Sequence, residues 1–247
     1  MLSKSKIKDI QSLSQKKLRD EAGVFIAEGP KLVQEILLEA NIQVKEVFAT
    51  NEWLNSNPVL SEEQQKKLQI VEDNELKKIS TLSTPNQVVG IFMQPEMKAL
   101  DQPDGLILML DTIQDPGNLG TIIRCADWFG IQHIICSSDS ADCFNPKVVQ
   151  STMGSIARVN IHYENLEEIL KRFSDVPVYA AMLDGIAADN TAIANPAFLL
   201  IGNEAKGIRP SLLHYVKHRV TIPRIGHAES LNAAVATGIL LYALRKP

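Results

Sequence analysis

Short apolar runs alternate with helix-like patterns in the second half of this chain. Runs typical of buried strands occur at 106–110, 133–136, 158–161, 178–182, 198–201 and 220–222. Between the first four runs, apolar residues recur with helical spacing, and a last helix is predicted over 231–244. Because parallel strands need long crossover connections, this alternation predicts an α/β fold in which helices cover both faces of a parallel sheet.

Composition limits the class of protein further. A chain of 247 residues that is 45% hydrophobic can bury one large core or two modest ones. No apolar run reaches the ~18 residues that a membrane span needs, and the basic start lacks the apolar stretch of a secretory signal. The three cysteines lack metal-binding spacing, so we expect reduced thiols in a cytoplasmic protein. The net charge of −4 disfavours a strongly basic nucleic-acid binder, although residues 1–20 hold six Lys or Arg against two Asp.

A polar stretch with two prolines divides the sequence. We place a linker at 96–105, between a small α/β domain over 1–95 and the parallel-sheet domain over 106–247. In the small domain a helix is predicted from Ile7 to Leu18, followed by a strand at 24–27.

Polar residues follow three of the predicted strands directly. The segment DPGNLGTIIR, from Asp115 on, breaks a strand and starts a helix, so that Asn118 stands at a strand end and Arg124 about two turns later. The segment IGNEAKG follows another strand with Gly202, where backbone can approach a ligand, and Glu204. Ligands of open α/β sheets bind at such carboxyl ends. Each segment alone is equally compatible with an ordinary surface turn.

The third segment precedes the last helix. Ser230 is predicted to cap that helix. Asn232 is a poor residue for a helix interior, so we interpret it as a candidate functional residue. The sequence has no P-loop lysine, no dinucleotide-binding glycine fingerprint and no Ser-His-Asp elbow, which counts against a nucleotide-dependent enzyme of the doubly wound class.

In this order and at these separations, the three segments resemble the SpoU (TrmH-type) family of RNA ribose 2′-O-methyltransferases, in the SPOUT class. The resemblance covers about 106–244, and the FIAEG stretch at 25–29 more loosely resembles the family's substrate-binding extension. It implies a deep trefoil knot in the C-terminal domain and S-adenosylmethionine as methyl donor, without a metal. It also implies a homodimer with active sites at the interface.

The resemblance also implies roles for particular residues. Those expected in catalysis are Asn118, Arg124, Glu204, Ser230 and Asn232. Those expected to bind the methyl donor are Ala181, Gly202, Ile222 and Leu231. Arg124 corresponds to the proposed base of the family, but a guanidinium holds its proton at neutral pH. An alternative is that Arg124 grips an RNA phosphate, which relays the proton, and stabilises the forming alkoxide.

RNA contact would depend on a few local cations. The candidates are Lys4, Lys6, Lys16, Lys17, Arg19 and Lys147. Gln150 stands where the family often has Arg, which would weaken or redirect RNA contact. We expect ribosomal RNA as substrate rather than transfer RNA. The alternatives are a tRNA ribose methyltransferase and a non-catalytic RNA-binding or ribosome assembly factor; retention of all five catalytic candidates counts against the latter.

Overall fold

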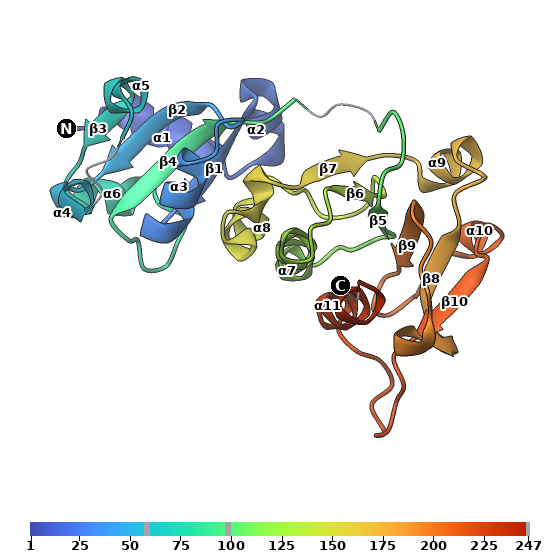
Figure 1. The fold of residues 1–247 in the computed structure, drawn as a ribbon. Helices are drawn as coiled ribbons and strands as arrows, with labels where there is room; N and C mark the ends of the chain where they lie inside the picture. The colour runs from blue at the N-terminus through green and yellow to red at the C-terminus, as the bar shows by residue number, and fades with distance from the viewer. Residues whose placement is uncertain (57–59, 97–99, 246–247) are drawn as a thin grey trace. The chain divides into compact units, whose positions relative to one another are not determined.

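The computed structural model describes residues 1–56, 60–96 and 100–245. The chain forms two compact units (Figure 1). The first contains Met1–Glu96 and Phe144–Ala157, and the second contains Met97–Cys143 and Arg158–Pro247. The structure thus groups 144–157 with the first unit, although the sequence placed this segment in the parallel-sheet domain. The predicted linker at 96–105 lies partly outside the described residues.

The second unit is built on a six-stranded parallel sheet. Its strands are β5 (Leu106–Leu110), β6 (His133–Cys136), β7 (Asn160–Tyr163), β8 (Val178–Ala187), β9 (Ala197–Ile201) and β10 (His218–Thr221). Their order in the sheet is β10-β8-β9-β5-β6-β7, and every pairing is parallel. This confirms the predicted α/β architecture. The trefoil knot that the family resemblance implies stays a prediction.

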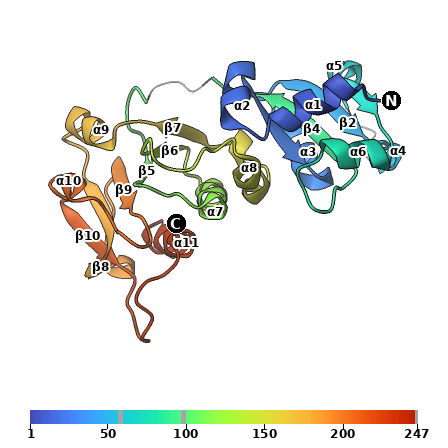
Figure 2. The same ribbon diagram turned by 180° about the vertical axis from the view of Figure 1, so that it is seen from behind.

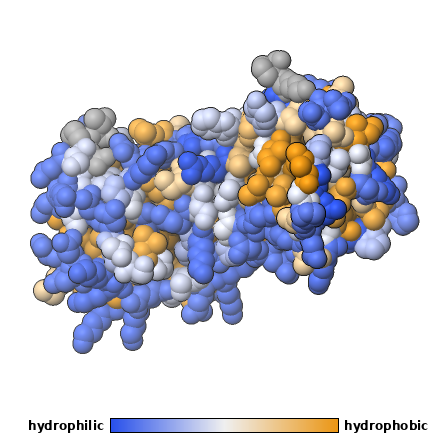
Figure 3. Space-filling view, turned by 90° about the horizontal axis from the view of Figure 1, so that it is seen from below, coloured by the Kyte–Doolittle hydropathy of each residue, from blue (hydrophilic) through white to orange (hydrophobic). Residues whose placement is uncertain are grey.

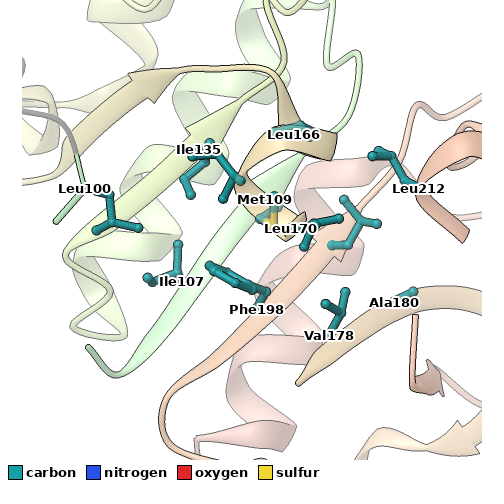
Figure 4. Close-up of a cluster of buried hydrophobic side chains, with 12 residues drawn as sticks. Leu100, Ile107, Met109, Ile135, Leu166, Leu170, Val178, Ala180, Phe198 and Leu212 are labelled. Carbon is teal, nitrogen blue, oxygen red and sulfur yellow. The ribbon is translucent and has the colours of Figure 1, made fainter. Parts of the chain in front are cut away.

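Helices cover both faces of this sheet, which explains why its central strands are apolar throughout. On one face, α9 (Leu166–Arg172) and α10 (Pro210–Leu213) pack on alternate side chains of the strands. This cluster includes Ile107, Met109 and Phe198 (Figure 4). The helices α7 (Pro116–Trp128) and α11 (Ala233–Leu244) pack against each other, as Figures 1 and 2 show from opposite sides.

The first unit has a four-stranded mixed sheet in the order β1-β4-β2-β3. Its strands are β1 (Val24–Glu28), β2 (Val44–Ala49), β3 (Leu68–Ile70) and β4 (Val88–Met93). Its helices are α1 (Lys4–Ser12), α2 (Lys16–Ala22), α3 (Pro30–Leu37), α4 (Asn51–Ser56), α5 (Glu62–Lys66), α6 (Asp73–Ile79) and α8 (Pro146–Thr152). The helix α8 packs against β1, where Phe144 stacks on Phe25 with ring centroids 5.3 Å apart.

The single helix predicted from Ile7 to Leu18 is wrong, because the chain turns after Ser12. The hydroxyls of Ser12 and Ser14 donate hydrogen bonds to the carbonyls of Asp9 and Gln11, which competes with helix continuation. Arg19 then donates to the carbonyls of Leu13 and Ser14 at 2.9 and 2.8 Å. These bonds fix the turn between α1 and α2.

No helix in the described ranges is long and apolar enough to cross a membrane.

Candidate active site

Asn118 lies at the start of α7, directly beyond the carboxyl end of β5. Asp115 caps this helix by accepting a hydrogen bond from the Asn118 backbone N–H at 2.8 Å, and Pro116 takes the first helical position. The helix therefore begins two residues before the predicted start at residue 118. This arrangement fixes the backbone of Asn118 at the edge of the sheet where ligands of parallel α/β folds bind.

The side chain of Asn118 joins the three polar segments. Its Nδ2 donates to Glu204 Oε1 at 2.5 Å, and its Oδ1 accepts a hydrogen bond from Asn232 Nδ2 at 2.7 Å. These partners are 86 and 114 residues away in sequence. The fold thus brings together three of the five residues expected in catalysis, and we call Asn118, Glu204 and Asn232 the amide cluster.

Asn232 has a second role that the sequence analysis assigned to Ser230. The Oδ1 of Asn232 accepts hydrogen bonds from the backbone N–H groups of Ala234 and Val235, so Asn232 is the N-cap of α11. Ser230 lies two residues earlier on an exposed loop and does not cap the helix. The prediction of Ser230 as the cap is therefore wrong, because Asn at this position fulfils the capping role equally well.

The two functions of Asn232 can be separated by mutation. In Asn232→Asp a carboxylate oxygen still caps α11, but the donor to Asn118 is replaced by a second acceptor. We expect unchanged thermal stability, measured by thermal unfolding, and an at least tenfold lower rate of methyl transfer, the activity that the family resemblance implies, measured by turnover. Asn232→Ala should instead lower the free energy of unfolding by about 1 kcal/mol through loss of the cap. Wild-type turnover in a folded Asn232→Asp protein would contradict this role.

Arg124 lies on a different face of α7 from Asn118. Six residues correspond to about 600° of helix rotation, which places Arg124 about 120° around the axis. It shares an exposed stripe with Thr121 and Trp128. Within the described part of the chain its guanidinium has no hydrogen-bond or ion-pair partner. A charged group that the fold leaves unpaired in this way is available to a ligand.

The loop after β9 folds tightly on itself. The backbones of Asn203 and Gly207 exchange two hydrogen bonds of 3.1 and 2.8 Å. A Cβ at Gly202 would lie 2.5 Å from the carbonyl carbon of Gly207. Glycine is therefore required at 202 by contact within the loop. The expected approach of this backbone to a ligand stays a prediction.

The four residues expected to bind the methyl donor lie in strands or in loops that follow them. Ala181 is in β8, while Gly202 and Ile222 directly follow β9 and β10. All three are partly buried, and Leu231, in the loop before α11, is 44% exposed. An apolar, uncharged set at the carboxyl edge of a parallel sheet fits the adenine of S-adenosylmethionine and leaves its sulfonium uncrowded. Among the described residues no three His, Cys, Asp or Glu side chains are grouped as a metal site would require.

The cations predicted to contact RNA differ in availability. Lys4 and Lys147 are exposed. The Nζ of Lys6 lies 2.5 Å from Glu46 Oε2. On α2, Lys16 and Lys17 face carboxylates one turn later, Asp20 at 2.8 Å and Glu21 at 3.8 Å.

Arg19 does not belong in this set. Arg19 is 1% exposed, and its guanidinium donates hydrogen bonds to the carbonyls of the turn before α2. The prediction that Arg19 contacts RNA is therefore wrong for this conformation, because a phosphate cannot reach the group.

An ion pair between a buried carboxylate and a half-exposed arginine follows the strands β5 and β9, and the sequence alone did not indicate it. Asp111 follows β5 and is fully buried, and Arg209 follows the loop after β9. Arg209 Nε donates to Asp111 Oδ1 at 2.6 Å, and a terminal nitrogen of Arg209 reaches Asp139 at 3.0 Å. A hydrogen bond from Ser137, followed by one from Arg209, holds the pKa of Asp139 below its usual value. The available signal was a carboxylate directly at the end of an apolar strand.

Comparison with known proteins identifies the family. The model of the SpoU rRNA Methylase family matches residues 105–242, more than half of the chain. The chain belongs to this family. The model of an MRM3-like substrate binding domain matches residues 4–90. The SpoU-family chain is accordingly an RNA methyltransferase with a substrate-binding domain in its first unit.

Individual relatives agree with this assignment over almost the whole chain. The 23S rRNA (guanosine(2553)-2′-O)-methyltransferase RlmP of Bacillus subtilis is 32% identical over 97% of this chain and 96% of its own length. A putative RNA methyltransferase of the TrmH family from Porphyromonas gingivalis has 38% identity and a TM-score of 0.87, covering 99% and 98% of the two chains. An AdoMet-bound rRNA methyltransferase from Sinorhizobium meliloti has 33% identity and a TM-score of 0.85, covering 98% and 95%.

Proposed function

We propose that this protein transfers a methyl group from S-adenosylmethionine to the 2′-hydroxyl of a ribose in ribosomal RNA. The observation that carries the proposal is the amide cluster, in which two hydrogen bonds join the three family segments at the carboxyl edge of the sheet. The Bacillus subtilis relative, named as a 23S rRNA 2′-O-methyltransferase, supports both the ribose and the ribosomal RNA. A ribosomal substrate also agrees with the predicted cytoplasmic location.

The reaction needs alignment and removal of one proton. S-adenosylmethionine supplies an activated methyl group, and the 2′-oxygen must lie about 3 Å behind it. Asn118 donates one amide hydrogen to a hydrogen bond with Glu204 and accepts a hydrogen bond from Asn232, so its carboxamide is held in one orientation. Its remaining amide hydrogen is free to bind a ribose oxygen. Ser230, which is exposed before α11, is proposed to bind the target nucleotide.

Arg124 stabilises negative charge on the RNA and is not the base that removes the proton. A guanidinium holds its proton at neutral pH, so direct proton abstraction is unfavourable. As a cation with a planar array of donors, Arg124 binds the phosphate next to the target ribose and stabilises the forming alkoxide. The phosphate, through bound water, relays the proton of the 2′-hydroxyl to solvent.

A second copy of the chain is proposed to complete the site. Three exposed apolar side chains, Val235, Ile239 and Tyr242, follow one face of α11 and are 52%, 41% and 75% exposed. Trp128 at the end of the adjacent α7 is 85% exposed. Figure 3 shows a hydrophobic patch on the surface of the second unit. An exposed apolar face of this kind is typical of a subunit interface, and it adjoins the stripe that carries Arg124.

A charge on this face should separate the subunits. In Ile239→Asp we expect a dimer-to-monomer shift in sedimentation equilibrium together with a methyl-transfer rate lowered at least tenfold, because a carboxylate cannot be buried unpaired in an interface. Leu38→Asp, at a 74% exposed leucine of the first unit, is the matched control and should remain dimeric and active. A wild-type protein that is monomeric at micromolar concentration would contradict the proposed dimer.

The substrate can be identified by transfer of tritiated methyl groups. The purified protein is incubated with labelled S-adenosylmethionine and, separately, with ribosomal RNA, ribosomal subunits and transfer RNA from cells that lack the protein. Label in ribosomal RNA, free or in subunits, supports the proposal. Label confined to transfer RNA supports the tRNA alternative, and binding of the methyl donor without transfer to any fraction supports the assembly factor.

A further inference from the structure

The loop 202–208, which carries Glu204, is held at both ends by hydrogen bonds to the two residues that follow β5. At its first end, Asn203 Nδ2 donates to the carbonyl of Thr112 at 2.9 Å. At its second end, Arg209 donates its backbone N–H to Asp111 Oδ2 at 2.8 Å and its Nε to Asp111 Oδ1 at 2.6 Å. Both carboxylate oxygens of Asp111 are therefore engaged by one residue.

Thr112 is the common anchor of the two ends. A terminal nitrogen of Arg209 donates to Thr112 Oγ1 at 2.6 Å, while the carbonyl of Thr112 accepts from Asn203. Thr112 has a φ of 60°, a left-handed conformation that is unusual for a β-branched residue. The surrounding hydrogen bonds must hold this conformation, which turns Thr112 toward the loop.

This arrangement is placed to control Glu204. Glu204 lies between the two anchored ends, and the loop is further closed by the paired backbones of Asn203 and Gly207. Its carboxylate meets Asn118 at 2.5 Å. Movement of the loop would therefore break the amide cluster without a change in any residue of the cluster.

We propose that Asp111 and Arg209 are positioning residues for methyl transfer, which hold loop 202–208 so that Glu204 orients Asn118. The inference rests on the proposed function where turnover is the measurement. The side chain of Arg209 is 42% exposed, whereas that of Asp111 is 1% exposed. Removal of Arg209 leaves the Asp111 carboxylate buried without its main cation, so the loop end must shift to hydrate it.

A double-mutant cycle distinguishes positioning from a general structural role. Arg209→Met and Glu204→Gln should each lower kcat at least tenfold with little change in the KM for RNA. If Arg209 acts through Glu204, the double variant should be no slower than the slower single variant. Arg209→Lys, which retains the charge, should recover part of the activity. Multiplicative losses in the double variant, or wild-type kcat in Arg209→Met, would overturn the proposal.

A second measurement does not depend on turnover. Hydrogen exchange of the backbone amides at 203–207 should accelerate at least tenfold in Arg209→Met and in Asp111→Asn. The control Lys171→Met removes an exposed ion pair with Glu167 on α9 and should leave this exchange unchanged. Unchanged exchange in both loop variants overturns the positioning role even if the wild-type protein methylates RNA. If amide exchange at 203–207 is faster in these variants but the wild-type protein transfers no methyl group, Asp111 and Arg209 do hold loop 202–208, and the proposed function is rejected.

Discussion

Arg124→Ala is expected to lower the rate of methyl transfer by about 10³-fold while leaving the Kd for S-adenosylmethionine unchanged. The expected loss matches the effect of removing one preorganised donor from a developing oxyanion, about 10²–10³-fold, together with the loss of a phosphate contact. Binding of the methyl donor should not change, because Arg124 lies on the exposed stripe of α7 and none of the four residues assigned to the donor belongs to that helix. Single-turnover rates and calorimetric titration measure the two quantities separately.

Arg124→Lys is the informative companion variant. It keeps the positive charge but lacks the planar donors that bind a phosphate in two places, so we expect an intermediate rate. Thermal unfolding of both variants should match the wild type, because an exposed side chain that has no hydrogen-bond or ion-pair partner among the described residues contributes little to stability. A rate within twofold of the wild type in Arg124→Ala would remove Arg124 from the mechanism.

Asn118→Ala is expected to lower the transfer rate by about 10²-fold, the lower end of the range for a single positioned donor. The substitution removes both hydrogen bonds of the amide cluster and the remaining amide hydrogen assigned to the ribose. It also leaves Glu204 and Asn232 without their common partner. The rate is measured in single turnover with saturating methyl donor, so that a change in donor affinity does not contribute.

Asn41→Ala provides a matched control for this substitution. Asn41 Nδ2 donates a 2.8 Å hydrogen bond to the carbonyl of Ala157 within the first unit, so the control also removes one anchored carboxamide. The substitution should lower the free energy of unfolding by about 1 kcal/mol and leave the transfer rate near that of the wild type. Equal losses of rate in the two variants would mean that Asn118 matters only for folding.

The order of polar segments and strand ends was readable from the sequence because strand and helix periodicities are local. The carboxyl ends of parallel strands meet at one edge, so the polar residues after β5 and β9 could be expected to lie together. The segment before α11 was assigned to the same site by the family resemblance. The structure adds that Asn118 is the link between Glu204 and Asn232. Local preference could not choose between Ser230 and Asn232 as the cap, since both residue types are good caps.

Contacts between distant segments could not be read in this way. The Asp111–Arg209 pair spans 98 residues, and only the fold shows that the carboxylate at the end of β5 meets the loop after β9. The prediction that Arg19 contacts RNA was wrong for a related reason. A cation in a basic stretch usually faces solvent, but this one folds back onto two carbonyls at the turn before α2.

Alkaline hydrolysis of RNA labelled by this protein shows whether the methyl group is on the ribose 2′-oxygen. Alkali cleaves RNA through attack of the 2′-hydroxyl on the neighbouring phosphate, and a methyl group on that oxygen prevents the attack. After complete hydrolysis, we expect tritium from S-adenosylmethionine to be recovered in alkali-stable dinucleotides. Tritium recovered in mononucleotides would show methylation of a base and would rule out ribose 2′-O-methylation.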